Sequence, residues 1–257
     1  MEQKIIIAID DIIKKVDHTK REEKFANEVR KRKKRFLPKE NREIMKVISE
    51  IIAFSQNAKS EKVEGAINSE AWKKMFSDFD INKVAEMNPC ALSDEYWSDI
   101  KGIRQKTKLF QIVMLARRLK EFNQGTIPLK TAVFETEIPE RIRTHEDIDA
   151  FWKGFEKMKK NMEINEIPFL RSTTTLLHFL LHTGYDCIKP DSVVMKVAKD
   201  IGIVEKETGE KNLKKVVSTI QEYCLCKSMR PPIIDLYLSF EGNQSSVKKF
   251  QKGNVPQ

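Results

Sequence analysis

Asp191 is the residue whose type and surroundings best suit it for chemistry. It follows Pro190 and opens an apolar helical pattern that runs from Val193 to Ile201. A carboxylate held at such a rigid point can stabilise developing positive charge, or orient and deprotonate a water molecule. Aspartate after proline is also an ordinary N-cap, which accepts backbone N–H bonds and is worth about 1 kcal/mol. Whether a ligand can reach the carboxylate separates the two interpretations.

Basic and hydroxyl side chains near this aspartate are candidates for binding phosphate groups. Lys189 and Lys196 flank the aspartate, and either lysine could contact phosphate or simply be solvated. Arg171, Ser172 and Thr173, at the start of another apolar helix, are the other candidates for contacting phosphate. These five residues therefore form the predicted binding set around the carboxylate.

Four further residues are candidates for contacting a ligand from other segments. Gln56 and Asn57 end a strongly apolar helix, and Glu50 lies earlier on the same helix. Glu50 could line a pocket or lie on a solvated face. Trp152 follows Phe151 in an apolar pattern, so it is either a core residue or a wall on which a ligand stacks.

We expect no metal and no organic cofactor. His178 and His182 lie one helical turn apart, as metal ligands can, but their helix is so apolar that packed histidines are the stronger interpretation, and no third ligand is evident. Cys224 and Cys226 are separated by one residue, which is less than zinc sites use. The four cysteines do not suit a disulfide framework, so we expect a reducing, cytoplasmic environment.

The composition is that of a globular protein with a polyanionic partner. Hydrophobic residues make up 40% and charged residues 33% of the 257 residues, which excludes a disordered chain. The 47 Lys and Arg exceed the 38 Asp and Glu by 9, and the pI is about 9.2. This surplus favours nucleic acid or an anionic surface. The N-terminal apolar stretch is too short for a signal peptide, and no uncharged run is long enough to cross a membrane.

Hydrophobic periodicity predicts an all-α chain with no strand. A basic segment at 20–35, which ends in six consecutive cations at 30–35, could be a solvated face or contact a phosphate backbone. Residues 123–143 have little periodicity and predict a loop. The remaining helices are predicted at 5–16, 41–54, 63–76, 81–87, 106–122, 144–162, 172–182, 193–201, 211–227 and 231–240.

Local signals mark several of the predicted helix ends. Asp80 is a predicted N-cap, and Thr144 with Asp147 forms a predicted capping box. Gly184 and Gly202 are predicted to stop the helices before them.

The segment from Ile167 to Val204 resembles the helix-hairpin-helix DNA glycosylase superfamily, the group of endonuclease III and the 3-methyladenine DNA glycosylases. Ile167-Pro168 resembles the Leu-Pro of the hairpin, and Gly184 resembles the glycine that closes the next helix. The run Pro190-Asp191-Ser192-Val193-Val194 resembles the Val-Asp-Thr-His-Val signature. Upstream, residues 50–60 are similar to an apolar helix that ends in Ser-x-Gln, and residues 76–85 and 100–108 are similar to 3-methyladenine DNA glycosylase I.

The resemblance implies a monofunctional DNA glycosylase with a two-lobed helical fold and a central cleft. Asp191 would be the catalytic aspartate, and Gln56 would fill the gap left by a flipped base. Thr173 stands where bifunctional members have the lysine that forms a Schiff base, so no lyase activity is expected. The two hairpin glycines are replaced by Phe169 and Arg171, so the Arg171 side chain would contact phosphate in place of the backbone. The zinc-binding ends of 3-methyladenine DNA glycosylase I are absent.

The resulting expectation is a monomeric enzyme that acts on double-stranded DNA with a damaged, alkylated base. It would have basic N-terminal helices at 1–40, a two-lobed glycosylase-like domain at 41–242, and a flexible tail at 243–257. The N-terminal and C-terminal helices would complete one lobe. Two alternatives are a non-catalytic DNA-binding protein on the same fold and a basic helical scaffold that binds another protein.

Overall fold

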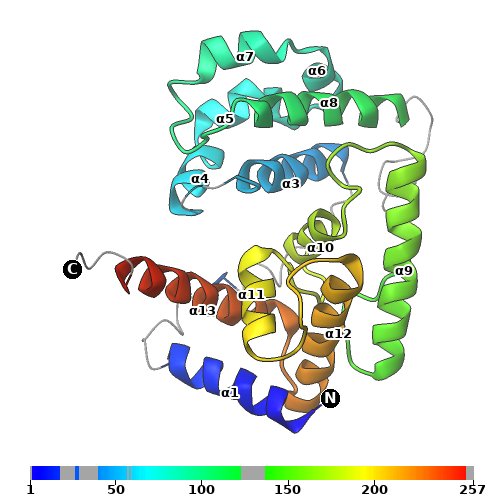
Figure 1. Cartoon of the computed structure of the whole chain (residues 1–257). Helices are drawn as coiled ribbons and strands as arrows, with labels where there is room; N and C mark the ends of the chain where they lie inside the picture. Colours follow the sequence, from blue (N-terminus) through cyan, green and yellow to red (C-terminus); the bar gives the residue numbers. More distant parts are fainter. Residues whose placement is uncertain are drawn as a thin grey trace. The chain divides into compact units, whose positions relative to one another are not determined.

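The structure is a computed structural model that describes residues 2–17, 27–28, 40–56, 58, 60–122 and 137–252. Every regular element among these residues is helical, which confirms the all-α prediction (Figure 1). The cationic run at 30–35, Asn57, most of the predicted loop and residues 253–257 lie outside the described part. The chain forms two compact units, and two of the boundaries between them fall inside the helices α9 (His145–Ile164) and α10 (Thr173–His182).

Unit 1 comprises Met1–Phe36, Ile138–Lys153 and Leu180–Gln257. Its helices are α1 (Gln3–Asp17), the start of α9 (His145–Ile164), the end of α10 (Thr173–His182), α11 (Ser192–Asp200), α12 (Glu210–Lys227) and α13 (Pro231–Lys252). Helix α13 packs against α1, α11 and α12 (Figure 1). The predicted apolar stripe of α1 is buried at Ile5, Ile9, Ile12 and Val16.

Unit 2 comprises Leu37–Glu137 and Gly154–Phe179. Its helices are α3 (Asn41–Phe54), α4 (Ser60–Ile67), α5 (Glu70–Met75), the 3-10 helix η1 (Ser77–Phe79), α6 (Ile81–Glu86), α7 (Pro89–Tyr96) and α8 (Thr107–Phe122), with the remaining parts of α9 and α10. Helix α8 packs against α3, α6 and α7, and its inward side chains are fully buried.

The predicted helix caps are confirmed. The Asp80 carboxylate accepts the N–H groups of Asn82 and Lys83 at 3.0 and 3.3 Å. The capping box is reciprocal, since Asp147 N–H donates to Thr144 Oγ1 at 3.2 Å and Thr144 N–H donates to Asp147 Oδ2 at 2.9 Å.

Both predicted glycine stops are confirmed as well. Gly184 and Gly202 follow their helices with φ of 96° and 81°. Glycine adopts this left-handed conformation without the steric cost that other residues incur, so it ends a helix readily.

The predicted helices differ from the observed ones in three places. The helix predicted at 63–76 is two helices, because Ser69 accepts the Trp72 N–H at 3.2 Å and donates to the Ala66 carbonyl at 2.6 Å, which starts α5 anew. Helix α7 was not predicted, although Asn88 caps it and Pro89 opens it. Helix α13 continues to Lys252 rather than ending at Phe240, so the predicted tail begins as helix.

The turn between α5 and α6 has an unusual backbone. Ser77, Asp78 and Phe79 all have positive φ, at 46°, 52° and 63°. This conformation costs a residue with a side chain about 1–2 kcal/mol. Burial of the Phe79 ring, which stacks on Phe76 with 6.3 Å between ring centroids, offsets part of that cost.

Gly65 and Gly102 of unit 2 differ in whether a side chain would fit at their positions. A Cβ on Gly102 would lie 1.8 Å from the Lys62 carbonyl oxygen, whereas a Cβ on Gly65 of α4 would meet no atom within 4 Å. We therefore expect Gly102→Ala to lower the free energy of unfolding by about 2–3 kcal/mol. Gly65→Ala should raise it by about 0.5–1 kcal/mol, because alanine favours the helix. Urea denaturation measures both, and equal effects would contradict this account of Gly102.

Candidate functional site

Asp191 caps α11 with one of its two carboxylate oxygens. Oδ1 accepts the N–H groups of Val193 and Val194 at 3.0 and 3.1 Å. Oδ2 lies 3.3 Å from the ammonium nitrogen of Lys189, and the Asp191 side chain is 31% exposed. The carboxylate is therefore fixed in orientation and still partly exposed, and it pairs with Lys189, a contact that the sequence did not predict.

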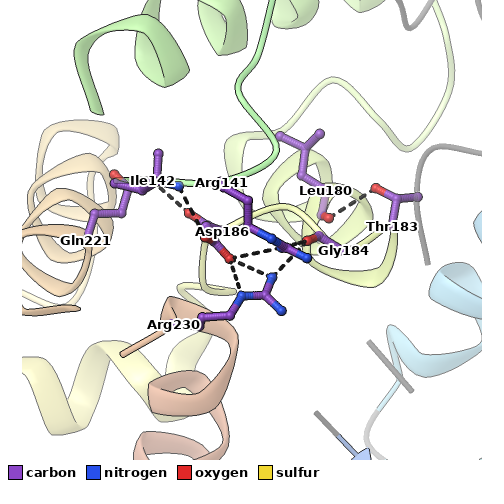
Figure 2. Close-up of polar contacts among 8 residues, drawn as sticks. All are labelled: Arg141, Ile142, Leu180, Thr183, Gly184, Asp186, Gln221 and Arg230. Carbon is purple, nitrogen blue, oxygen red and sulfur yellow. Dashed lines mark hydrogen bonds and ion pairs between the residues drawn. The ribbon is translucent and has the colours of Figure 1, made fainter. Parts of the chain in front are cut away.

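A buried ion cluster anchors the loop that leads to Asp191 (Figure 2). The side chain of Asp186 is 3% exposed, and Oδ1 accepts two N–H bonds from Arg230, at 2.8 and 2.6 Å. Arg141 approaches the same oxygen at 3.4 Å, and Ile142 N–H donates to Oδ2 at 3.1 Å. Both arginines also donate to the Gly184 carbonyl. These bonds to both oxygens offset the cost of burying the carboxylate, while Arg230 Nη1 is buried without a hydrogen-bond partner.

The main chain of this loop is held as well. Asp186 N–H donates to the Glu140 carbonyl at 3.1 Å, and Gln221 Nε2 donates to the Asp186 carbonyl at 3.0 Å. Lys189 N–H donates at 2.8 Å to Asp235 Oδ1, a buried carboxylate on α13. The segment that presents Asp191 is thus tied to three other parts of unit 1.

The hairpin turn between α9 and α10 keeps a conformation that suits glycine. Phe169, which stands where the resembling pattern has glycine, has φ of 69°. Its carbonyl accepts the Thr175 hydroxyl at 2.6 Å, and Leu170 N–H donates to the Pro168 carbonyl at 2.8 Å. Side-chain bonds therefore hold a turn shape that the sequence alone does not favour.

The predicted binding residues of the hairpin differ in exposure. Arg171 and Ser172 are exposed, and Ser172 Oγ accepts the Thr175 N–H at 3.2 Å as a cap of α10. Thr173 is only 5% exposed, so its side chain has little surface for a contact with DNA.

Gln56 is engaged within unit 2. Its Oε1 accepts the Arg104 N–H at 2.7 Å, and its Nε2 donates to the Ala53 carbonyl at 2.6 Å. Insertion into a duplex would first break both bonds, at about 0.5–1.5 kcal/mol each. The nearby ammonium of Lys108 donates to Ser55 Oγ at 3.0 Å, and burial lowers the pKa of Lys108.

The other predicted site residues are distributed between the units. Glu50 is half-buried on α3 of unit 2, and Lys196 is half-buried on α11 of unit 1. Trp152 is half-buried in unit 1, with its ring edge-on to Phe151 at 5.5 Å. Asn57 lies outside the described residues. Of the predicted site residues, Lys189 and Asp191 are in direct contact, at 3.3 Å.

Metal-ligand side chains and cysteines are the other reactive groups in the described part of the chain. No group of three or more His, Cys, Asp or Glu residues among them is arranged to hold a metal ion. The four cysteines are free thiols, and burial, with the nearby Asp186 carboxylate, raises the pKa of Cys224. No described helix has the length and apolar character needed to cross a membrane.

No protein-family model, curated protein or solved structure matches this chain.

Sequence reasoning missed the ion cluster and Asp235. Each acid stands alone in an apolar stretch, Asp186 between Tyr185 and Cys187 and Asp235 within Ile233–Leu238. The available signal was an isolated acidic residue in an apolar pattern. Because a charged residue is rarely buried without a partner, this pattern indicates a buried and paired carboxylate. The partners lie 44 to 46 residues away in the sequence, so no local pattern could identify them.

We expect the two arginines of the cluster to contribute unequally. Arg230→Gln should lower the free energy of unfolding by about 3–5 kcal/mol, because it leaves a buried charge poorly paired. Arg141→Gln should cost about 1 kcal/mol, since Arg141 is more exposed and its contact is longer. Urea denaturation provides the comparison. Adding Asp186→Asn to Arg230→Gln should recover part of the loss, and no recovery would argue against an electrostatic origin.

Proposed function

We propose that this chain is a monofunctional DNA glycosylase that removes damaged, alkylated bases from double-stranded DNA by hydrolysis of the N-glycosidic bond. It would have the two-lobed helix-hairpin-helix fold of that superfamily, act as a monomer in the cytoplasm, and need no cofactor. The observation that carries the proposal is the state of Asp191, whose carboxylate is oriented by helix N–H groups and is still 31% exposed.

The chemistry required of such an enzyme suits this group. Cleavage of an N-glycosidic bond develops positive charge on the sugar, and a fixed carboxylate beside the sugar stabilises that charge. It can also orient or deprotonate the attacking water. Because capping uses Oδ1, Oδ2 is the oxygen available for this role once Lys189 moves aside.

Phosphate binding would accompany the reaction. Lys189 and Lys196 lie on the segment that begins α11, and Arg171 and Ser172 are exposed in the hairpin. The left-handed Phe169 adds support, since this backbone conformation favours glycine, the residue that the family pattern has at this position. Alkylated purines carry positive charge, so stacking on an aromatic ring such as Trp152 would favour them.

A non-catalytic DNA-binding protein is the second candidate. One observation favours it, namely that Lys189 lies 3.3 Å from the Asp191 oxygen that capping leaves unused. In that case the carboxylate would serve only the helix and the lysine.

Release of free base from methylated duplex DNA, separated by chromatography, tests the proposal. Asp191→Asn should lower release at least 100-fold, because the stabilising charge is lost. Asparagine caps helices about as well as aspartate, so folding and DNA binding should change little. Asp80→Asn, which alters a cap of the same geometry on α6, should leave release unchanged. No base release by the wild-type protein would exclude the glycosylase.

The salt dependence of DNA binding tests the basic residues. Each phosphate contact contributes about 0.9 to the slope of log K against log salt concentration. Lys196→Gln should reduce the slope by about that amount. Lys199→Gln on the same helix should not, because Lys199 pairs with Glu207 at 3.3 Å. If the affinity for DNA does not change with salt concentration, the protein-binding scaffold is favoured instead.

A further inference from the structure

Helix α13 contacts the Asp191 segment at two points on one of its faces. Asp235 and Gly242 are seven residues apart, which is about two turns of a helix. Asp235 accepts the Lys189 N–H at 2.8 Å, and Gly242 lies against Val193. One contact therefore lies just before Asp191 in the chain, and the other just after it.

The contact before Asp191 links Asp235 to the Asp191 carboxylate through Lys189. Lys189 N–H is held by Asp235, and the Lys189 carbonyl accepts the Asp191 N–H at 2.8 Å. The Lys189 ammonium then faces Asp191 Oδ2. The backbone of one residue is thus fixed at both ends, and its side chain lies over the reactive oxygen.

The contact after Asp191 requires a residue without a side chain. A Cβ on Gly242 would lie 2.5 Å from Val193 Cγ1 and 2.9 Å from the Val193 carbonyl oxygen. Val193 donates one of the two N–H bonds to Asp191 Oδ1. Any displacement of Val193 would therefore turn the carboxylate.

Asp235 is a buried hydrogen-bond acceptor for this segment. It is 4% exposed among the apolar residues of α13, and burying a carboxylate is costly. Its hydrogen bond with the Lys189 N–H offsets part of that cost. What the carboxylate provides is a directional bond that fixes the position of Lys189.

We propose that Asp235 and Gly242 are positioning residues that set the orientation of the Asp191 carboxylate from α13. The catalytic consequence rests on the proposed glycosylase function, whereas the orientation itself does not. Displacement of a reacting group by about 1 Å can lower a rate 100-fold, so small shifts in this contact should change turnover strongly.

The first test compares backbone amide exchange, measured by mass spectrometry, in three variants. Asp235→Ala and Gly242→Ala should each speed exchange at Val193 and Val194, whose N–H groups bind Asp191 and neither of which contacts Asp235 directly. Asp235→Asn keeps an oxygen that can accept the Lys189 N–H and should restore slow exchange. Tyr237→Phe is the matched control, because it removes a hydrogen bond from the same helix to Asp17 and should leave these amides unchanged.

The second test uses steady-state base release well below the unfolding temperature of every variant. Asp235→Ala and Gly242→Ala should lower kcat about 10- to 100-fold with KM nearly unchanged, and Asp235→Asn should recover most of the loss. Because the added Cβ of Gly242→Ala would press on Val193, urea denaturation of every variant accompanies the kinetics, so that a loss of stability is distinguished from a loss of positioning.

The outcomes for the two proposals are distinct. Unchanged exchange at Val193 and Val194 in both alanine variants overturns the positioning inference, whatever the activity. An equal effect of Tyr237→Phe also overturns it, because the effect would then be general loosening of α13. Faster exchange in a protein whose wild type releases no base supports positioning and rejects only the glycosylase.

Discussion

The buried carboxylate of Asp186 is the constraint on which the candidate site depends. A carboxylate that is 3% exposed is tolerated only when its oxygens are fully bonded, and here two arginines and a backbone N–H supply those bonds. The arginines come from the segment before α9 and from the start of α13. The bonds to Asp186 therefore hold these two segments and the loop to Asp191 together. Because Asp186 lies in the loop that leads to Asp191, these bonds also fix the position of that loop.

Capping and chemistry are compatible roles for Asp191, because a carboxylate has two oxygens. Asp80 shows the simple case, in which Oδ1 accepts two backbone N–H groups at the start of α6. Asp191 repeats that geometry at α11 and adds the lysine contact at Oδ2. The cap restricts rotation of the side chain, so it determines where Oδ2 points. A ligand phosphate that attracted the Lys189 ammonium would expose this oxygen without disturbing the cap.

The sequence predicted those features whose causes lie within a few residues. The caps at Asp80 and Thr144, the glycine stops and the stripe of α1 depend on neighbours in the chain, and all are confirmed. The helix break at Ser69 also has a local cause, the Ser69 cap of α5. It was not predicted because the apolar pattern continues across Ser69 without interruption. The anchoring of the candidate site could not be predicted, because Asp186 and Lys189 find their partners through the tertiary fold. The pairing of Lys189 with Asp191 was not predicted either, although only Pro190 separates the two residues in the sequence.

The hairpin shows why a missing glycine does not decide the shape of a turn. Phe169 has φ of 69°, which costs about 1–2 kcal/mol relative to an ordinary conformation. Such a residue persists only where its surroundings determine it, and the bond from the Thr175 hydroxyl to the Phe169 carbonyl is one such determinant. The turn therefore keeps the backbone course that glycine would give. Phe169 adds a side chain that glycine lacks, and under the proposed function the exposed Arg171 guanidinium, rather than the backbone alone, would bind a phosphate at this turn.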